Sequence, residues 1–241
     1  SVNKSHHLKR WWLFQPRNYM EDTIPQEDIY ILDTETATLG KGVMEIAWLR
    51  VTNELEVLEE FRTLVNPEMP VNPGAFGVHG ISDDDVKDSP LTADVVKVLN
   101  SKSLCVGHNI NYDIRVLKDY WVPEDSFCTL ALARAHIKGT TNHKLETLQR
   151  ELNLPVQDSH SALGDVRTCR DVILHVMELT GYTFPELRLR SKVRKVIHTM
   201  PFGKWKGQPL LKIDKGYRSW LLEQSDIEPD LRYSLEKLKN I

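Results

Sequence analysis

The order of strand-like and helix-like segments constrains the fold of this chain most. Residues 28–36 (DIYILDTET) form a short run of apolar and β-branched side chains that predicts a strand. Residues 43–53 and 56–67 predict two further strands, and Asn53 and Glu54 predict a hairpin turn between them. The first third of the chain therefore predicts the antiparallel half of a sheet.

The remaining segments alternate between helix and strand types. Residues 103–109 predict a buried strand, and residues 67–82 are rich in proline and glycine and predict a loop. Amphipathic or helix-favouring patterns predict helices over residues 89–101, 112–121, 129–137, 142–153 and 161–181, the last ending at Gly181. Leading strands followed by this alternation favour an α/β fold.

Four acidic residues stand at the ends of these predicted elements. Asp33 and Glu35 are two apart on the first strand, so their side chains point to the same side. Asp113 opens the helix that follows the strand over 103–109. Asp165 lies in the first turns of the last long helix, five residues after His160.

Four converging carboxylates would repel one another unless divalent cations neutralise them. Oxygen ligands in such numbers favour Mg²⁺ or Mn²⁺ over zinc. Two such ions hold the attacking and leaving oxygens of a phosphoryl transfer, and His160 has the ordinary pKa range of a base that accepts a proton from water. Taken alone, Asp33 with Glu35 would more often be a cap or a surface pair, and Asp113 fits an N-cap of its helix. Asp165 alone is an ordinary exposed helix acid, and His160 alone an ordinary loop histidine.

Three short segments carry a family resemblance. Residues 31–36 (ILDTET), 108–113 (HNINYD) and 160–165 (HSALGD) resemble the three exonuclease motifs of the DnaQ-like DEDDh superfamily, over roughly residues 28–180. The resemblance implies a ribonuclease H-like fold with a five-stranded mixed sheet flanked by helices. It also implies a catalytic set with His160 as general base and four metal ligands, Asp33, Glu35, Asp113 and Asp165.

The same resemblance implies a set of substrate-binding residues. Those near the terminal nucleotide are Thr34, Thr36, Leu39, His79 and Ile81, and those along the path of the strand are His108 and Asn109. Leu39 would wedge between the last two bases, and His79 lies in a glycine-flanked loop segment, GVHGI. Core packing explains Leu39 and Ile81 equally well.

The charge of the chain is unevenly distributed. Residues 186–218 hold ten Lys or Arg against Glu186 and Asp214, whereas the whole chain has a net charge of −3. A basic stretch on an acidic body indicates either a surface that binds phosphates or a linker that forms ion pairs with the body. The charge pattern leaves both interpretations open.

The tail resembles the C-terminal domain of exonuclease X-like proteins, through residues 202–210 (FGKWKGQPL) and 217–222 (YRSWLL). We expect it to be a small α+β subdomain. Lys204, Trp205 and Lys206 combine cations with an aromatic ring, which favours contact with nucleic acid. The alternative is a tight hairpin whose aromatic rings cover the tail's own core. We expect Trp220 and its neighbouring leucines to be core residues under either interpretation.

These patterns predict three regions: an N-terminal arm (1–26), an exonuclease domain (27–182), and a basic linker with a C-terminal domain (183–241). The arm could bind a protein partner or a second copy of the chain. Three scattered cysteines, no secretory signal and no membrane-spanning stretch favour a reducing cytoplasm.

We expect a two-metal-dependent 3′→5′ exonuclease that releases nucleoside 5′-monophosphates from single-stranded and duplex DNA ends. One alternative is a 3′→5′ exoribonuclease of the same fold that trims RNA. Another is an accessory end-processing or nucleic-acid-binding subunit of a larger DNA machine.

Overall fold

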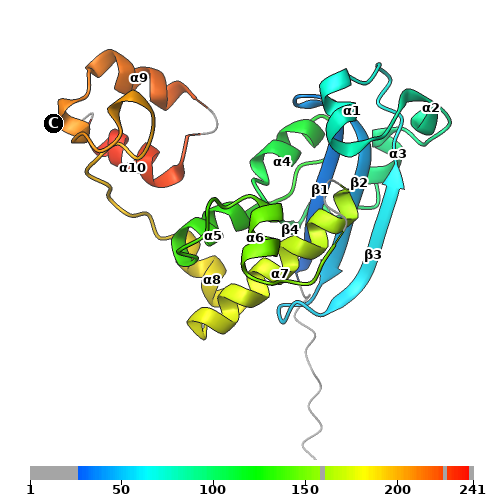
Figure 1. The fold of residues 1–241 in the computed structure, drawn as a ribbon, viewed down its shortest axis with the longest axis horizontal. Coiled ribbons are helices and arrows are strands. Elements are labelled where there is room, and N and C mark those ends of the chain that lie inside the picture. Colours follow the sequence, from blue (N-terminus) through cyan, green and yellow to red (C-terminus); the bar gives the residue numbers. More distant parts are fainter. Residues whose placement is uncertain (1–26, 158–160, 225–226, 239–241) are drawn as a thin grey trace, which may run out of the picture.

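A mixed five-stranded sheet forms the centre of the computed structural model, which describes residues 27–157, 161–224 and 227–238 (Figure 1). The strand order is β3-β2-β1-β4-β5. The strands are β1 (Asp28–Thr38), β2 (Lys41–Val51), β3 (Val57–Leu64), β4 (Ser103–Gly107) and β5 (Asp125–Cys128). β2 is antiparallel to β1 and β3, whereas β4 pairs parallel with both β1 and β5. The expected mixed sheet is confirmed, although the sequence pattern did not reveal β5.

Helices α1 to α8 connect and cover the strands, and α9 and α10 belong to the tail. They are α1 (Pro73–His79), α2 (Asp83–Val86), α3 (Thr92–Val96), α4 (Asn111–Leu117), α5 (Thr129–His136), α6 (Leu145–Glu151), α7 (Ala162–Thr180), α8 (Phe184–Ser191), α9 (Lys215–Glu223) and α10 (Pro229–Leu238). The loop prediction for residues 67–82 is wrong over α1. The Asn72 side chain accepts a hydrogen bond from Gly74 N, and Pro73 occupies the first helical turn, where its missing N–H costs nothing.

The sheet is covered on both faces. On one face, Ile29, Ile31 and Leu49 pack in a core with residues of α7 such as Val172 and Val176. On the other face, Trp48 and Cys105 pack with Leu99, Leu117 and Trp121 from the α3 and α4 region. These two apolar layers fix the strands on both sides, as a central sheet with parallel strands requires.

The face covered by α7 becomes acidic at one end of the sheet. Along β1 the buried stripe Ile29–Ile31 continues, at the same spacing of two, with Asp33 and then Glu35. On β2, Glu45 pairs in register with Glu35, immediately before the register shifts between Glu35 and Thr36. A bulge at this point ends the regular pairing beside the acidic residues, a position where bulges commonly occur in functional sites.

Residues beyond the predicted boundary at residue 182 contact the body of the protein. Phe184 and Leu187 of α8 are buried in the core beneath α7. Arg188 pairs with Glu27 and Asp125, and Lys192 pairs with Asp125. The first part of the basic stretch therefore acts as the ion-pairing linker, and we propose that the body ends after α8.

The tail has a core of its own, built around residues such as Met200, Leu210, Leu221 and Leu231. Figure 1 shows it apart from the sheet, after an extended linker. Within residues 192–224 and 227–238 we find helices and two 3₁₀ turns, Gly203–Trp205 and Leu210–Lys212, and the β component is reduced to one bridge between Thr199 and Pro209. The regular secondary structure described in the expected α+β tail is therefore helical, apart from this single bridge. None of the helices described is both long and apolar enough to span a membrane.

Gly107 ends β4, one residue after the last pair that this strand forms with β1. A Cβ atom at this position would lie 2.8 Å from the Leu32 carbonyl oxygen and 2.6 Å from Ile110 Cδ1. We expect Gly107→Ala to lower the free energy of unfolding by about 1–3 kcal/mol, because backbone must move to relieve the overlap. Urea denaturation monitored by circular dichroism measures this change.

Gly77→Ala is the matched control, because Gly77 lies in α1 and a Cβ atom there would meet no atom within 4 Å. We expect this variant to be as stable as the parent or more stable. Equal destabilisation by both substitutions would contradict the close packing assigned to Gly107.

Candidate active site

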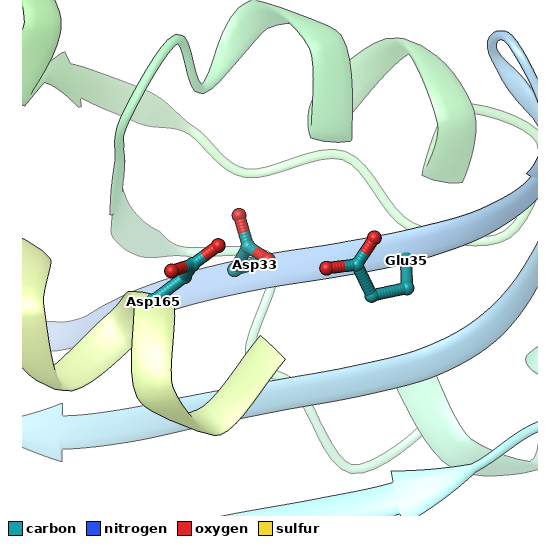
Figure 2. Close-up of side chains that lie close together, drawn as sticks. All are labelled: Asp33, Glu35 and Asp165. Atoms are coloured by element: carbon teal, nitrogen blue, oxygen red, sulfur yellow. The ribbon is translucent and has the colours of Figure 1, made fainter. Parts of the chain in front are cut away.

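Three carboxylates meet at the acidic end of the sheet (Figure 2). Asp33 and Glu35 extend from β1, and Asp165 extends toward them from the first turn of α7. One carboxylate oxygen from each residue lies within 4.8 Å of the other two. Segments about 130 residues apart in sequence therefore supply a single cluster of oxygen ligands.

Asp113 lies beside this cluster and is buried at the start of α4. Its Oδ1 atom accepts hydrogen bonds from Thr34 N at 3.1 Å and from Thr34 Oγ1 at 2.8 Å. The pairing of β1 with β4 ends at Ile31, so Asp113 satisfies a backbone donor of β1 beyond the end of its neighbouring strand. These bonds hold Asp113 against the same stretch of β1 that carries Asp33 and Glu35.

Burial and mutual repulsion perturb these acids strongly. Desolvation, followed by the charges of Asp113 and Asp165, raises the pKa of Asp33 well above its usual range. Desolvation and Asp165 raise the pKa of Glu35 to about 8. Desolvation also raises the pKa of Asp113 to about 7, although the Thr34 hydrogen bonds oppose this rise. The cluster therefore resists full ionisation unless a positive charge is present.

A divalent cation fits this donor set. The three converging atoms are all carboxylate oxygens, which are the ligands that Mg²⁺ and Mn²⁺ prefer over softer metals. Bound positive charge would also offset the repulsion that raises the pKa values of these acids. His160, the proposed general base, lies outside the residues that the structure describes.

The β1–β2 turn beside the cluster is held by α4. Tyr112 Oη lies 2.8 Å from Thr36 Oγ1 and accepts a hydrogen bond from Gly40 N at 2.9 Å. Between these anchored residues, the side chain of Leu39 is 90% exposed. Leu39 therefore does not pack in the core.

His79 connects α1 to β1. Its Nδ1 atom accepts a hydrogen bond from Ile81 N at 3.0 Å, so Nε2 carries the proton and donates to the Thr36 carbonyl oxygen at 3.3 Å. His79 lies in the last turn of α1, so the prediction that it is a loop residue is wrong. Ile81 is buried with Ala37 and Met44, which favours its core-packing interpretation.

A cleft of about 490 Å³ opens beside Asp33 and Asp165. His108 lines it, but its Nε2 donates to the His143 carbonyl oxygen at 2.7 Å and its Nδ1 lies 3.0 Å from Thr129 Oγ1. Desolvation lowers the pKa of His108 to about 4, so the ring is neutral at physiological pH. Asn109 is exposed at a positive φ of 69°, a conformation that asparagine tolerates well.

Two residues near this site, Tyr112 and Glu45, were not predicted from the sequence. Tyr112 stands next to Asp113 inside a motif that was recognised, so its position was available from the sequence although its role was not. Glu45 gave no signal, because an acidic residue on a predicted strand is ordinarily assigned to the exposed face. Arg134 and Lys144 also line the cleft and contribute positive charge to it.

The exonuclease family model (RNase_T) matches residues 30–173, which include all four acids. The chain belongs to this exonuclease family. It is 30% identical to exodeoxyribonuclease 10 of Escherichia coli (strain K12) over 214 residues, which cover 86% of this chain and 96% of that relative. It is 31% identical to the DNA polymerase III subunit epsilon of Salmonella typhimurium (strain LT2), over 60% of this chain and 69% of the relative.

Solved structures agree with the family assignment. The chain is similar to exonuclease X in complex with 5′ overhanging duplex DNA, with a TM-score of 0.58 and 30% identity over 66% of this chain and 96% of that one. The structure of exonuclease I matches with a TM-score of 0.63 at 17% identity, over 75% of this chain and 50% of that one, and supports the fold alone. The DnaQ-like, ribonuclease H-like assignment is thereby confirmed.

The perturbed acids predict how the stability of this exonuclease-family protein depends on pH. Between the usual glutamate pKa of 4.5 and the folded value of about 8, Glu35 holds a proton that the unfolded chain has lost. Asp33 and Asp113 act in the same direction, so the native state binds more protons and stability falls as pH rises. We expect the melting temperature of EDTA-treated protein to be lower at about pH 8 than at about pH 5.5, and Mn²⁺ to raise it most at the higher pH.

Asp33→Asn provides the control, because an amide of the same shape cannot ionise. We expect this variant to be more stable than the parent at about pH 8 without metal, and to lose most of the stabilisation by Mn²⁺. A metal-free parent that is most stable near pH 8 would contradict the repulsion assigned to the cluster.

Proposed function

We propose that the protein is a divalent-metal-dependent 3′→5′ exodeoxyribonuclease that releases nucleoside 5′-monophosphates. The observation that carries this proposal is the convergence of Asp33, Glu35 and Asp165 within 4.8 Å in a chain of the exonuclease family. DNA is favoured because the name of one relative is exodeoxyribonuclease 10 and because the exonuclease X structure holds duplex DNA.

The four acids would hold the cofactor, which we propose to be two Mg²⁺ or Mn²⁺ ions. Asp33, Glu35 and Asp165 supply the converging oxygens, and Asp113 would contribute through its other oxygen, Oδ2, since Oδ1 accepts from Thr34. When bound, the ions would activate water and stabilise the charge that develops on the phosphodiester.

The residues around the cluster would hold the strand end and move the proton. His160 would accept the proton of the attacking water, as the 160–165 motif implies. Thr34 and Thr36, with His79, would fix the terminal nucleotide against β1, and the exposed Leu39 would separate it from the preceding base. This positioning would favour cleavage one nucleotide at a time from a frayed or single-stranded end.

A nuclease assay with matched substrates tests this proposal. We expect the parent to shorten 5′-labelled single-stranded DNA stepwise with Mg²⁺ or Mn²⁺, and EDTA to abolish the reaction. Asp165→Asn should lower kcat by roughly a thousandfold or more, because losing one ligand removes several kcal/mol of transition-state stabilisation. Denaturing gels of the labelled products measure the rates.

Matched RNA and duplex DNA substrates complete the assay. Faster hydrolysis of RNA than of DNA would show that the alternative exoribonuclease activity is the correct one. Binding without hydrolysis under all metal conditions would favour the accessory-subunit alternative. Residues 1–26, the proposed docking arm for a partner or a second copy, lie outside the residues described, and pull-downs with and without them test that role.

The tail would bind the strand upstream of the site, although not through Trp205. Trp205 packs against the tail core, and its indole nitrogen is buried. In contrast, Trp220 is 50% exposed, so the prediction that it is a core residue is wrong. Its ring stacks on Tyr217 at 5.4 Å, and Lys204 Nζ lies 5.6 Å from the Tyr217 ring. An exposed indole beside cations favours base stacking on a single strand.

We expect Trp220→Ala to weaken the binding of long single-stranded DNA by roughly tenfold, since base–aromatic stacking contributes about 1–3 kcal/mol. Hydrolysis of a four-nucleotide substrate, too short to reach the tail, should not change. Fluorescence anisotropy in Ca²⁺ measures binding without turnover. Tyr120→Ala removes another exposed aromatic, from the body, and should leave both properties unchanged. Equal binding by Trp220→Ala and the parent would contradict the stacking role.

A further inference from the structure

Glu45 is a fully buried carboxylate at the acidic end of the sheet. It lies on β2, in register with Glu35 on β1, and it faces α7 from the same side of the sheet as Ala47 and Leu49. A buried ionised group is costly unless charged or hydrogen-bonding partners compensate it. Its partners therefore indicate why a carboxylate occupies this position.

The two oxygens of Glu45 have separate partners. Oε2 accepts a hydrogen bond from Ala162 N at 2.7 Å, and Oε1 pairs with Arg62 Nε from the neighbouring strand β3. Ala162 is the first residue of α7, where backbone N–H groups have no partner within the helix and the helix dipole favours negative charge. Glu45 thus joins the beginning of α7 to the sheet across 117 residues of sequence.

The position of this bond matters because Asp165 lies three residues after Ala162, in the same turn. The carboxylate of Asp165 must reach within 4.8 Å of both Asp33 and Glu35, which are fixed on β1. Val172 and Val176 hold the middle of α7, about two or more turns beyond Asp165. Nearer to Asp165, Ala162 and Val166 pack in the core, and Arg167 pairs with Glu60 on β3. The Glu45–Ala162 bond adds a direct hydrogen bond from the sheet to the first residue of the turn that carries Asp165.

We propose that Glu45 is a positioning residue that places Asp165 in the carboxylate cluster and thereby completes the cation site. This role rests on the proposed metal-dependent function. Glu45 does not act as a further ligand, because its two oxygens already bind Ala162 N and the Arg62 guanidinium. It acts on the cation through the placement of α7.

Calorimetric titration of Mn²⁺ into the full chain tests the role without relying on nuclease activity. We expect Glu45→Ala to weaken Mn²⁺ binding by about 10–100-fold, the usual effect of losing an outer-shell partner. With the DNA substrate, kcat should fall by a similar factor while KM stays within about threefold, because the variant leaves the strand-binding residues intact.

The Glu45→Gln variant distinguishes the effect of the hydrogen bond to Ala162 from the effect of the negative charge of Glu45. Its amide oxygen can still accept from Ala162 N, while the half-exposed Arg62 side chain can turn to solvent. We expect this variant to recover most of the Mn²⁺ affinity and kcat lost in Glu45→Ala. Mn²⁺ binding as weak as that of Glu45→Ala would assign the effect to charge and overturn the positioning role.

Two further variants serve as controls. Arg62→Ala removes the ion pair but keeps the bond to Ala162, so it should stay close to the parent in Mn²⁺ affinity. Val172→Ala loosens the core beneath α7 and matches Glu45→Ala in reduced stability. If Val172→Ala weakens Mn²⁺ binding as much as Glu45→Ala does, at an equal loss of melting temperature, the effect is general destabilisation and the proposal fails.

Failure of the proposed function has a different result. A parent that binds Mn²⁺ but leaves DNA intact would refute the proposed function, and the comparisons of Mn²⁺ binding among the variants would remain valid.

Discussion

The repulsion among buried carboxylates at one end of the sheet is the constraint on which the rest of this structure depends. Asp33, Glu35 and Asp165 converge where burial already disfavours ionisation, and the charge of Asp165 further raises the pKa of both Asp33 and Glu35. Such an arrangement costs stability in a metal-free protein, and it persists because rigid elements hold its members. The same cost makes the cluster a strong site for a hard cation.

The scaffold opposes this repulsion with hydrogen bonds from partners outside the cluster. Thr34 holds Asp113 against β1, and Glu45 holds the beginning of α7 against β2. Both bonds lie where regular pairing ends: one beyond the last β1–β4 pair and one at the unpaired N–H groups of a helix. Backbone groups that secondary structure leaves unsatisfied are thus used to position the acids.

The substrate side of the site depends on a second set of contacts. Tyr112 and His79 both contact Thr36, from α4 and α1 respectively, so the turn that carries the exposed Leu39 is anchored from two directions. Tyr112 is adjacent to Asp113 in the chain. The residue that contacts the turn and one of the acids are therefore neighbours on the same helix, α4.

The sequence by itself determined the strand that carries Asp33 and Glu35, the helix starts that carry Asp113 and Asp165, and the family. The alternation of apolar and polar residues along a strand and the apolar spacing of a helix are local properties of the sequence. They can therefore be recognised without knowledge of the tertiary structure. Predictions from local composition were wrong where a tertiary contact or a helix cap decided the secondary structure or the burial of a residue. A Pro- and Gly-rich segment formed α1 because Asn72 caps it, and Trp220 became exposed because Leu221, one position on, faces the tail core.

Only the tertiary structure decided that Glu45 is buried, that Arg188 and Lys192 form ion pairs with the body, and that Trp205 packs inward while Trp220 does not. Each of these outcomes depends on a partner far along the chain or on which face of an element is covered. A carboxylate on a strand is exposed or buried according to what packs over it. In this protein the covering element is α7, whose first backbone N–H, 117 residues from Glu45, makes burial of that charge tolerable.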